Sequence, residues 1–196
     1  MSLAVWRKMM ITVKPATVFA DVKEVVGPKH PDASVCWCLT YRLPAKENKA
    51  LTGAARGKRV AEMLQKGPIG VLAYDEDEVV GWAAVAPRSE TTFDRSRTIP
   101  RVDDADVWCV WCIRVKPGHR GKGISHHLLA GAAAYARGNG AAILEGYPLD
   151  NEGKTINTTM AYVGTKALFE KAGFQKVADT KSVLDGFPRI LMRLEL

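Results

Sequence analysis

Apolar runs separated by turn residues divide the second half of the chain into strands and helices. Residues 107–115 are almost all apolar, which is typical of a strand covered on both faces, and a Pro-Gly turn at 116–118 ends them. Residues 124–137 place apolar side chains at helical spacing, and residues 142–147 form a second buried strand. Strand, helix and strand in this order predict a parallel crossover unit.

The first half of the chain carries shorter signals. Residues 11–15 indicate a strand, residues 21–26 indicate a helical turn, and residues 35–43 indicate an extended segment that ends before a proline. A helix is expected over residues 58–66, where the apolar positions share one face and a Gly-Pro pair follows. Residues 71–85 predict an antiparallel hairpin, because two apolar runs flank an acidic turn.

The last part of the chain adds a short helix over residues 165–172 and two strands over residues 174–178 and 189–195. All these elements together predict an α/β fold with a central mixed sheet and helices on both of its faces. The chain shows no repeat, low-complexity tract or linker, so residues 1–196 are expected to form a single domain.

The composition fits a packed protein that attracts anions. Hydrophobic residues make up 47% of the 196 residues, and 28 Lys and Arg against 21 Asp and Glu give a net charge of +7. The longest apolar stretch, residues 128–136, has about half the length that a bilayer span needs. Arg7 and Lys8 interrupt the N-terminal apolar residues. We therefore expect a soluble, cytoplasmic protein without membrane contact.

The four cysteines come as two close pairs, Cys36 with Cys38 and Cys109 with Cys112. Two such pairs suggest a zinc site. Both pairs, however, lie in runs that resemble strands, where side chains at positions 109 and 112 diverge unless a bulge intervenes. We therefore favour buried, reduced thiols and no metal.

The segment from Arg120 to Ser125 lies between the first buried strand and the following helix. The start of a helix leaves backbone N–H groups unpaired and carries partial positive charge, which favours anions. Gly121 and Gly123 permit the dihedral angles that a nest of N–H groups needs, and Arg120 and Lys122 add full charges. The spacing matches neither a Walker A loop nor a dinucleotide fingerprint. The segment is expected to bind a pyrophosphate.

Residues 113–124 resemble the acyl-CoA signature of the Gcn5-related N-acetyltransferases (GNAT), in which a strand, an Arg-x-x-Gly-x-Gly/Ala loop and a helix follow one another. Ser125 stands where that motif has Gly or Ala. Residues 167–174 are similar to the second signature of the family, a short helix that ends in Gly-Phe. The resemblance covers roughly residues 70 to 178.

The resemblance implies a GNAT fold, with the sheet splayed between two parallel strands, and acetyl-CoA as cosubstrate. Cofactor binding is then expected from Ile113, Arg114, Val115, Arg120, Gly121, Lys122, Gly123, Ile124 and Ser125. An amine would attack the thioester directly, and loops at 88–106 and 149–162, with the N-terminal segment, would form its pocket. The acceptor would be a small-molecule or peptide amine, and a homodimer stays open.

The catalytic acid and base are less clear from the sequence. Phe169 stands where many relatives have a tyrosine acid, so Tyr162 and Tyr147 are the candidates for that role. Glu145 lies among apolar residues and is the candidate base, although a structural pair with an arginine is the alternative.

Three other functions compete with catalysis of acetyl transfer. The absence of a tyrosine at position 169 leaves open a degenerate acyl-CoA-binding sensor or scaffold. A nucleic-acid-binding module is disfavoured, because the basic residues are dispersed and no RNP-like or helix-turn-helix pattern occurs. Zinc binding by the cysteines is the third.

Overall fold

The computed structural model describes residues 10–30, 32–34, 37–157 and 159–196. Its helices are α1 (Phe19–Val26), α2 (Ala45–Ala50), α3 (Ala54–Leu64), α4 (Ile124–Gly138) and α5 (Lys166–Lys171), with 3-10 turns η1 (Arg88–Glu90), η2 (Thr92–Arg95) and η3 (Met160–Val163). Its strands are β1 (Ile11–Pro15), β2 (Val71–Asp75), β3 (Glu78–Pro87), β4 (Trp108–Val115), β5 (Ile143–Gly146), β6 (Gln175–Leu184) and β7 (Phe187–Glu195).

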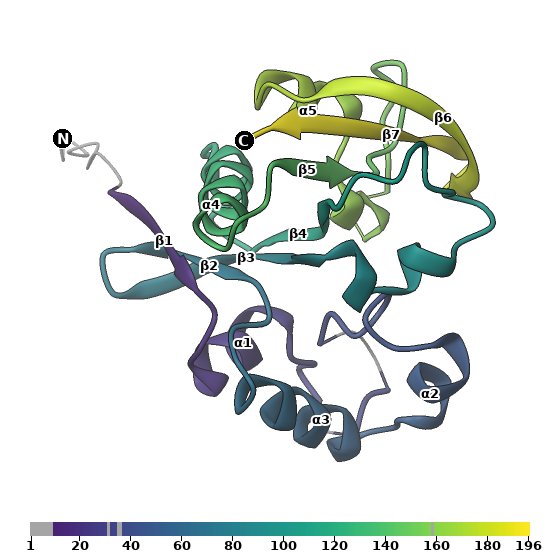
Figure 1. Cartoon of the computed structure of the whole chain (residues 1–196). Coiled ribbons are helices and arrows are strands. Elements are labelled where there is room, and N and C mark those ends of the chain that lie inside the picture. Colours follow the sequence, from purple (N-terminus) through teal and green to yellow (C-terminus); the bar gives the residue numbers. More distant parts are fainter. Residues whose placement is uncertain (1–9, 31, 35–36, 158) are drawn as a thin grey trace, which may run out of the picture.

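The strands form one mixed sheet in the order β1-β2-β3-β4-β5-β7-β6. Neighbouring strands run antiparallel except β4 and β5, which are parallel. α4 connects these two strands, as the predicted crossover requires. α4 and α5 cover one face of the sheet, and α1 and α3 lie on the other (Figure 1). The predicted mixed α/β fold is confirmed.

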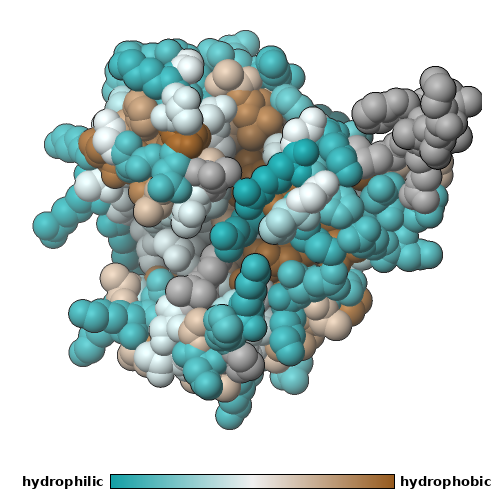
Figure 2. Space-filling view, turned by 180° about the vertical axis from the view of Figure 1, so that it is seen from behind, coloured by the Kyte–Doolittle hydropathy of each residue, from teal (hydrophilic) through white to brown (hydrophobic). Residues whose placement is uncertain are grey.

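Each face of the sheet has its own apolar core. Leu128, Leu129 and Ala132 of α4 pack on the first face, and Val22 and Val60 of α1 and α3 pack on the second. Hydrophilic residues cover most of the surface seen from behind, and apolar residues show in smaller patches (Figure 2). Within the described ranges, no helix has the length and apolar character needed to cross a bilayer.

β4 and β5 diverge soon after they meet. They share only three residue pairs, which run from Trp108 with Leu144 to Val110 with Gly146. Beyond Val110, β4 continues to Val115 and stays paired with β3 alone. The backbone groups of residues 111–115 that point away from β3 therefore line a gap between the two parallel strands.

A β-bulge marks the start of this divergence. Ala84 pairs with Cys112 and the next residue, Val85, pairs with Val110, so Trp111 is the extra residue on β4. The bulge cancels one step of the side-chain alternation. Cys109, Trp111 and Cys112 therefore all belong to the core on the α1 and α3 face.

Most predicted elements are confirmed, and one is wrong. Residues 37–43 form turns instead of an extended segment, and Trp37, Cys38 and Tyr41 have left-handed backbone angles of 54°, 52° and 66°. Residues 35 and 36 of that prediction lie outside the described residues. The pattern also missed α2 and the 3-10 turns, and it made β6 too short.

Candidate active site

The glycine-rich loop enters α4 through left-handed backbone. Gly121 and Gly123 have φ angles of 76° and 77°, which glycine adopts at little cost. A Cβ atom at either position would project into open space, so the requirement for glycine there is conformational. No side chain caps the start of α4, and the buried Ile124 anchors the helix in the core. The His126 N–H donates to the Gly123 carbonyl at 3.0 Å, whereas the amides of Ile124 and Ser125 precede the first intrahelical hydrogen bond and are available to an anion.

A cavity of about 340 Å³, here called the loop cavity, extends from this loop along the end of β4. It is lined by Ile113, Arg114, Val115, His119, Arg120, Gly121, Gly123, Ile124, Ser125, Thr159, Ala161 and Tyr162. Every predicted cofactor residue lines it except Lys122, whose side chain is exposed. Thr159 and Ala161 also line it; they belong to the loop at 149–162, which the resemblance implied for the amine pocket and not for the cofactor.

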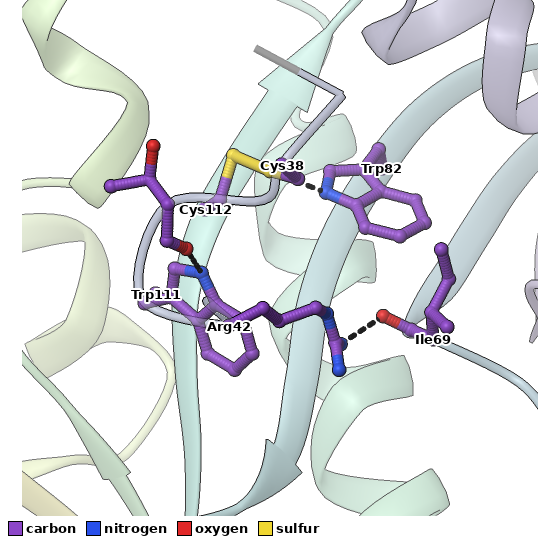
Figure 3. The surroundings of a disulfide bond; sticks show 7 residues. Cys38, Arg42, Ile69, Trp82, Trp111 and Cys112 are labelled. Carbon is purple, nitrogen blue, oxygen red and sulfur yellow. Dashed lines mark hydrogen bonds between the residues drawn. A yellow bond between two sulfur atoms is a disulfide. The ribbon is translucent and has the colours of Figure 1, made fainter. Parts of the chain in front are cut away.

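The cysteines differ from the prediction of four reduced thiols. Cys38 and Cys112 form a disulfide across 74 residues of sequence, and Cys109 is a free, buried thiol. Cys36 lies outside the described residues. The left-handed turn at Cys38 directs its sulfur toward β4, and the bulge turns Cys112 to meet it (Figure 3). The indole Nε1 of Trp82 donates to Cys38 Sγ at 3.1 Å.

A second cavity of about 410 Å³, here called the disulfide cavity, lies against this bridge. It is lined by Cys38, Thr40, Trp111, Cys112, Arg114, Thr159, Met160 and Tyr162. The N-terminal segment and the loop at 149–162, which the resemblance implies for the amine pocket, both contribute to it. No residue of the loop at 88–106 lines it.

The two cavities share Arg114, Thr159 and Tyr162. Arg114 comes from the part of β4 that is not paired with β5. Tyr162 comes from the 3-10 turn η3 in the loop after β5. The half-buried Tyr162 is therefore at the junction of a polar cavity that begins at the glycine loop and an apolar cavity that ends at the disulfide. Of the three predicted catalytic residues, Tyr162 alone lines these cavities.

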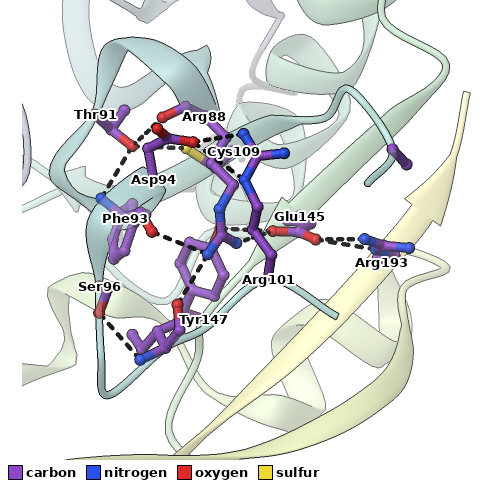
Figure 4. Close-up of polar contacts among 12 residues, drawn as sticks. Arg88, Thr91, Phe93, Asp94, Ser96, Arg101, Cys109, Glu145, Tyr147 and Arg193 are labelled. Atoms are coloured by element: carbon purple, nitrogen blue, oxygen red, sulfur yellow. Dashed lines mark hydrogen bonds and ion pairs between the residues drawn. The ribbon is translucent and has the colours of Figure 1, made fainter. Parts of the chain in front are cut away.

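Glu145 and Tyr147 belong instead to a buried hydrogen-bond network that joins β5 to Arg88 and to Arg193 of β7 (Figure 4). Glu145 Oε2 accepts from Arg88 Nη1 at 2.6 Å and from the Tyr147 hydroxyl at 2.7 Å. Glu145 Oε1 accepts from Arg193 Nε at 3.0 Å and from its Nη2 at 2.8 Å. Both oxygens of the Glu145 carboxylate are thus already taken by guanidinium and hydroxyl donors of the protein. The geometry supports the structural pair that was the alternative for Glu145.

Arg88 also fixes the loop that follows β3. Its Nη2 donates to the carbonyl oxygens of Phe93 and Ile99 at 2.9 and 2.8 Å. Burial raises the pKa of Tyr147 well above its usual value, so this hydroxyl stays protonated in the network. The loop at 88–106 is thus held against β5, and none of its residues lines either cavity.

Phe169 of α5 packs on Gly146 at the end of β5. It is fully buried, and a Cβ on Gly146 would lie 2.0 Å from its ring, so the glycine makes room for the phenyl group. Phe174 packs against it edge to face at 4.9 Å. Phe169 therefore has a packing role and offers no proton.

The sequence model of the acetyltransferase (GNAT) family matches residues 37–174. The chain belongs to this family. GNAT members transfer acetyl groups from acetyl-CoA, so the chain is an acetyl-CoA-dependent N-acetyltransferase. The resemblance seen in the glycine loop and in the helix at 167–174 is confirmed.

Solved GNAT structures share the fold at low sequence identity. A GNAT-family structure from Desulfovibrio desulfuricans is 20% identical, with a TM-score of 0.55 over 95% of this chain and 99% of its own. The Salmonella typhimurium protein yncA, solved with acetyl-CoA, is 18% identical, with a TM-score of 0.54 over 95% and 94%. The Thermoplasma acidophilum N-acetyltransferase PaiA, solved with coenzyme A, is 15% identical, with a TM-score of 0.53 over 96% and 100%. No curated protein matches the chain.

Proposed function

We propose that this GNAT enzyme acetylates an amine by direct attack, with the acetyl donor in the loop cavity and the amine in the disulfide cavity. The observation that carries the proposal is the meeting of the two cavities at Arg114, Thr159 and Tyr162. A donor and an acceptor held in adjoining cavities meet at that junction without a covalent enzyme intermediate.

The lining of the loop cavity offers groups that suit the charged and amide parts of acetyl-CoA. The pyrophosphate would accept hydrogen bonds from the amides at the start of α4, which the left-handed glycines leave accessible. The guanidinium of Arg120 adds a positive charge beside it. The unpaired edge of β4, beyond Val110, offers backbone groups to the amides of the pantetheine arm. The same edge, near Ile113 and Val115, can donate an N–H group to the thioester carbonyl.

The proposed reaction forms one bond and breaks one. Acetyl-CoA, when bound, supplies the acetyl group and a thiolate leaving group. The amine nitrogen bonds to the carbonyl carbon, the carbon–sulfur bond breaks, and the nitrogen releases one proton. In this proposal Tyr162, which lines both cavities, gives its hydroxyl proton to the departing sulfur and recovers a proton from solvent.

No carboxylate or imidazole lines the disulfide cavity among the residues that the structure describes. Glu145 is occupied by Arg88 and Arg193. We propose that the amine enters in its neutral form and that its released proton passes to water. The positive charge of Arg114 favours this neutral form, because a nearby cation lowers the pKa of an ammonium group.

Thioester consumption with a panel of amines, followed as released thiol, tests the proposal. Tyr162→Phe is expected to lower kcat by about a hundredfold while the KM for acetyl-CoA changes little. Tyr135→Phe is the matched control, because Tyr135 packs on Trp108 outside both cavities and its loss is expected to leave kcat unchanged.

Two outcomes would contradict the proposal. An unchanged kcat in Tyr162→Phe would remove Tyr162 from the reaction. Tight acetyl-CoA binding without turnover on any amine would favour the sensor or scaffold function instead.

A further inference from the structure

We infer that the acceptor is a small monoamine with an aryl or alkyl body, and that the disulfide cavity selects against amines with a second positive charge. This inference rests on the proposed function, because it assigns the chemical class of the amine that the disulfide cavity takes.

The walls of the disulfide cavity are mainly apolar. Trp111 forms part of its floor, the sulfur atoms of Cys38 and Cys112 lie beside it, and the side chain of Met160, 37% exposed, stands at the rim. An indole, a thioether and a disulfide favour contact with aromatic and aliphatic groups. The volume of about 410 Å³ is within the range of small-molecule sites, roughly 300–1,000 Å³.

The charge of the cavity wall disfavours diamines. Arg114 is the one charged side chain among its lining residues, and it lies at the junction where the reacting nitrogen must arrive. A second ammonium group in this cavity would lose its hydration and meet no carboxylate, so its burial would be unfavourable.

Carboxylates close in sequence to the cavity already have cationic partners. On the loop that leads to η3, Asp150 pairs with Lys166 at 3.3 Å and Glu152 pairs with Lys154 at 3.1 Å. On β5, Glu145 pairs with Arg88 and Arg193. Asp185, which accepts the Asn157 backbone N–H of the loop that leads to η3 at 2.9 Å, does not line the disulfide cavity.

The apolar floor is held in place from several directions. Trp111 Nε1 donates to the Thr40 carbonyl at 3.1 Å, and the Arg42 guanidinium stacks on the indole at 5.0 Å while it donates to the Ile69 carbonyl (Figure 3). The disulfide ties Cys38 to the same strand. A wall fixed in this way is preorganised and cannot easily rearrange to bring a carboxylate to a second charge.

The experiment compares kcat/KM for n-butylamine and 1,4-diaminobutane, which differ only in the second amino group, and for 3-phenylpropylamine. The wild-type enzyme is expected to prefer each monoamine over the diamine by at least about tenfold. Met160→Glu places a carboxylate at the rim and is expected to shift this preference about tenfold toward the diamine. Met160→Gln, of similar size but uncharged, is expected to leave the preference within about twofold of the wild type.

The outcomes separate this inference from the proposed function. Turnover of the diamine equal to or faster than that of butylamine overturns the inference and leaves amine acetylation standing. Tenfold better use of a peptide N-terminus than of every small amine also overturns it. No turnover on any amine overturns both. An equal shift in Met160→Glu and Met160→Gln would show that charge does not set the preference, which contradicts the inference.

Discussion

The guanidinium of Arg88 lies 2.6 Å from the carboxylate of Glu145, and both side chains are 1% exposed. The pair joins the loop after β3 to the short strand β5. Arg193 of β7 binds the second oxygen of the same carboxylate. Because β5 is the strand from which β4 diverges, this ion pair stabilises the strand that borders the gap beside β4.

Glu145→Gln should destabilise the protein without removing a catalytic group. Removal of one charge leaves the buried Arg88 without its partner, which costs roughly 3–5 kcal/mol. Urea unfolding measures this loss, and Glu170→Gln, at an exposed position on α5, serves as the control with little expected effect. A Glu145→Gln enzyme of normal stability that has lost about a hundredfold in kcat would instead identify Glu145 as the base.

The disulfide between Cys38 and Cys112 should contribute to stability through the 74-residue separation that it closes. We expect a reductant to lower the free energy of unfolding by about 2–4 kcal/mol. The Cys38→Ser/Cys112→Ser double variant should be equally destabilised and insensitive to the reductant. The denatured protein should also show two fewer thiols without reductant than with it, and equal thiol counts in the two conditions would refute the disulfide.

Cys109 should be chemically inert in the folded protein. Burial raises the pKa of its thiol to about 12, so almost no thiolate exists at pH 8. Peptide mapping after iodoacetamide treatment is expected to find Cys109 unmodified in native protein and modified in urea. Rapid native labelling would contradict this.

The raised pKa of Cys109 also predicts how the free energy of unfolding depends on pH. The folded pKa lies above the unfolded value of roughly 8.5, so the contribution of the neutral thiol is complete below that pH and is lost as pH rises toward 12. Between pH 8 and pH 10, the wild type should lose more stability than Cys109→Ala.

Local patterns predicted the sheet and the cofactor loop well. The hairpin at β2 and β3 and the β4-α4-β5 crossover depend on periodicity and turn residues within about 30 positions, and such signals are readable from one sequence. The glycines of the loop were readable because positive φ angles favour glycine at positions 121 and 123.

Long-range pairings were not readable. The partner of Glu145 is 57 residues away at Arg88, and the partner of Cys112 is 74 residues away at Cys38. A single extra residue at Trp111 reverses the side-chain alternation of β4, and no local composition signals it. The position of Tyr162 between two cavities likewise depends on a 3-10 turn whose placement is set by tertiary packing.

The most direct test of the account is a calorimetric titration of Gly121→Val/Gly123→Val with acetyl-CoA and with acetyl-pantetheine, which lacks the diphosphate. Gly123→Ala is a milder second variant, and Gly138→Ala, at the far end of α4 where a Cβ meets open space, is the control. We predict at least about a tenfold loss of affinity for acetyl-CoA, little change for acetyl-pantetheine, and no effect in the control. Folded variants that bind acetyl-CoA as tightly as the wild type would contradict the account.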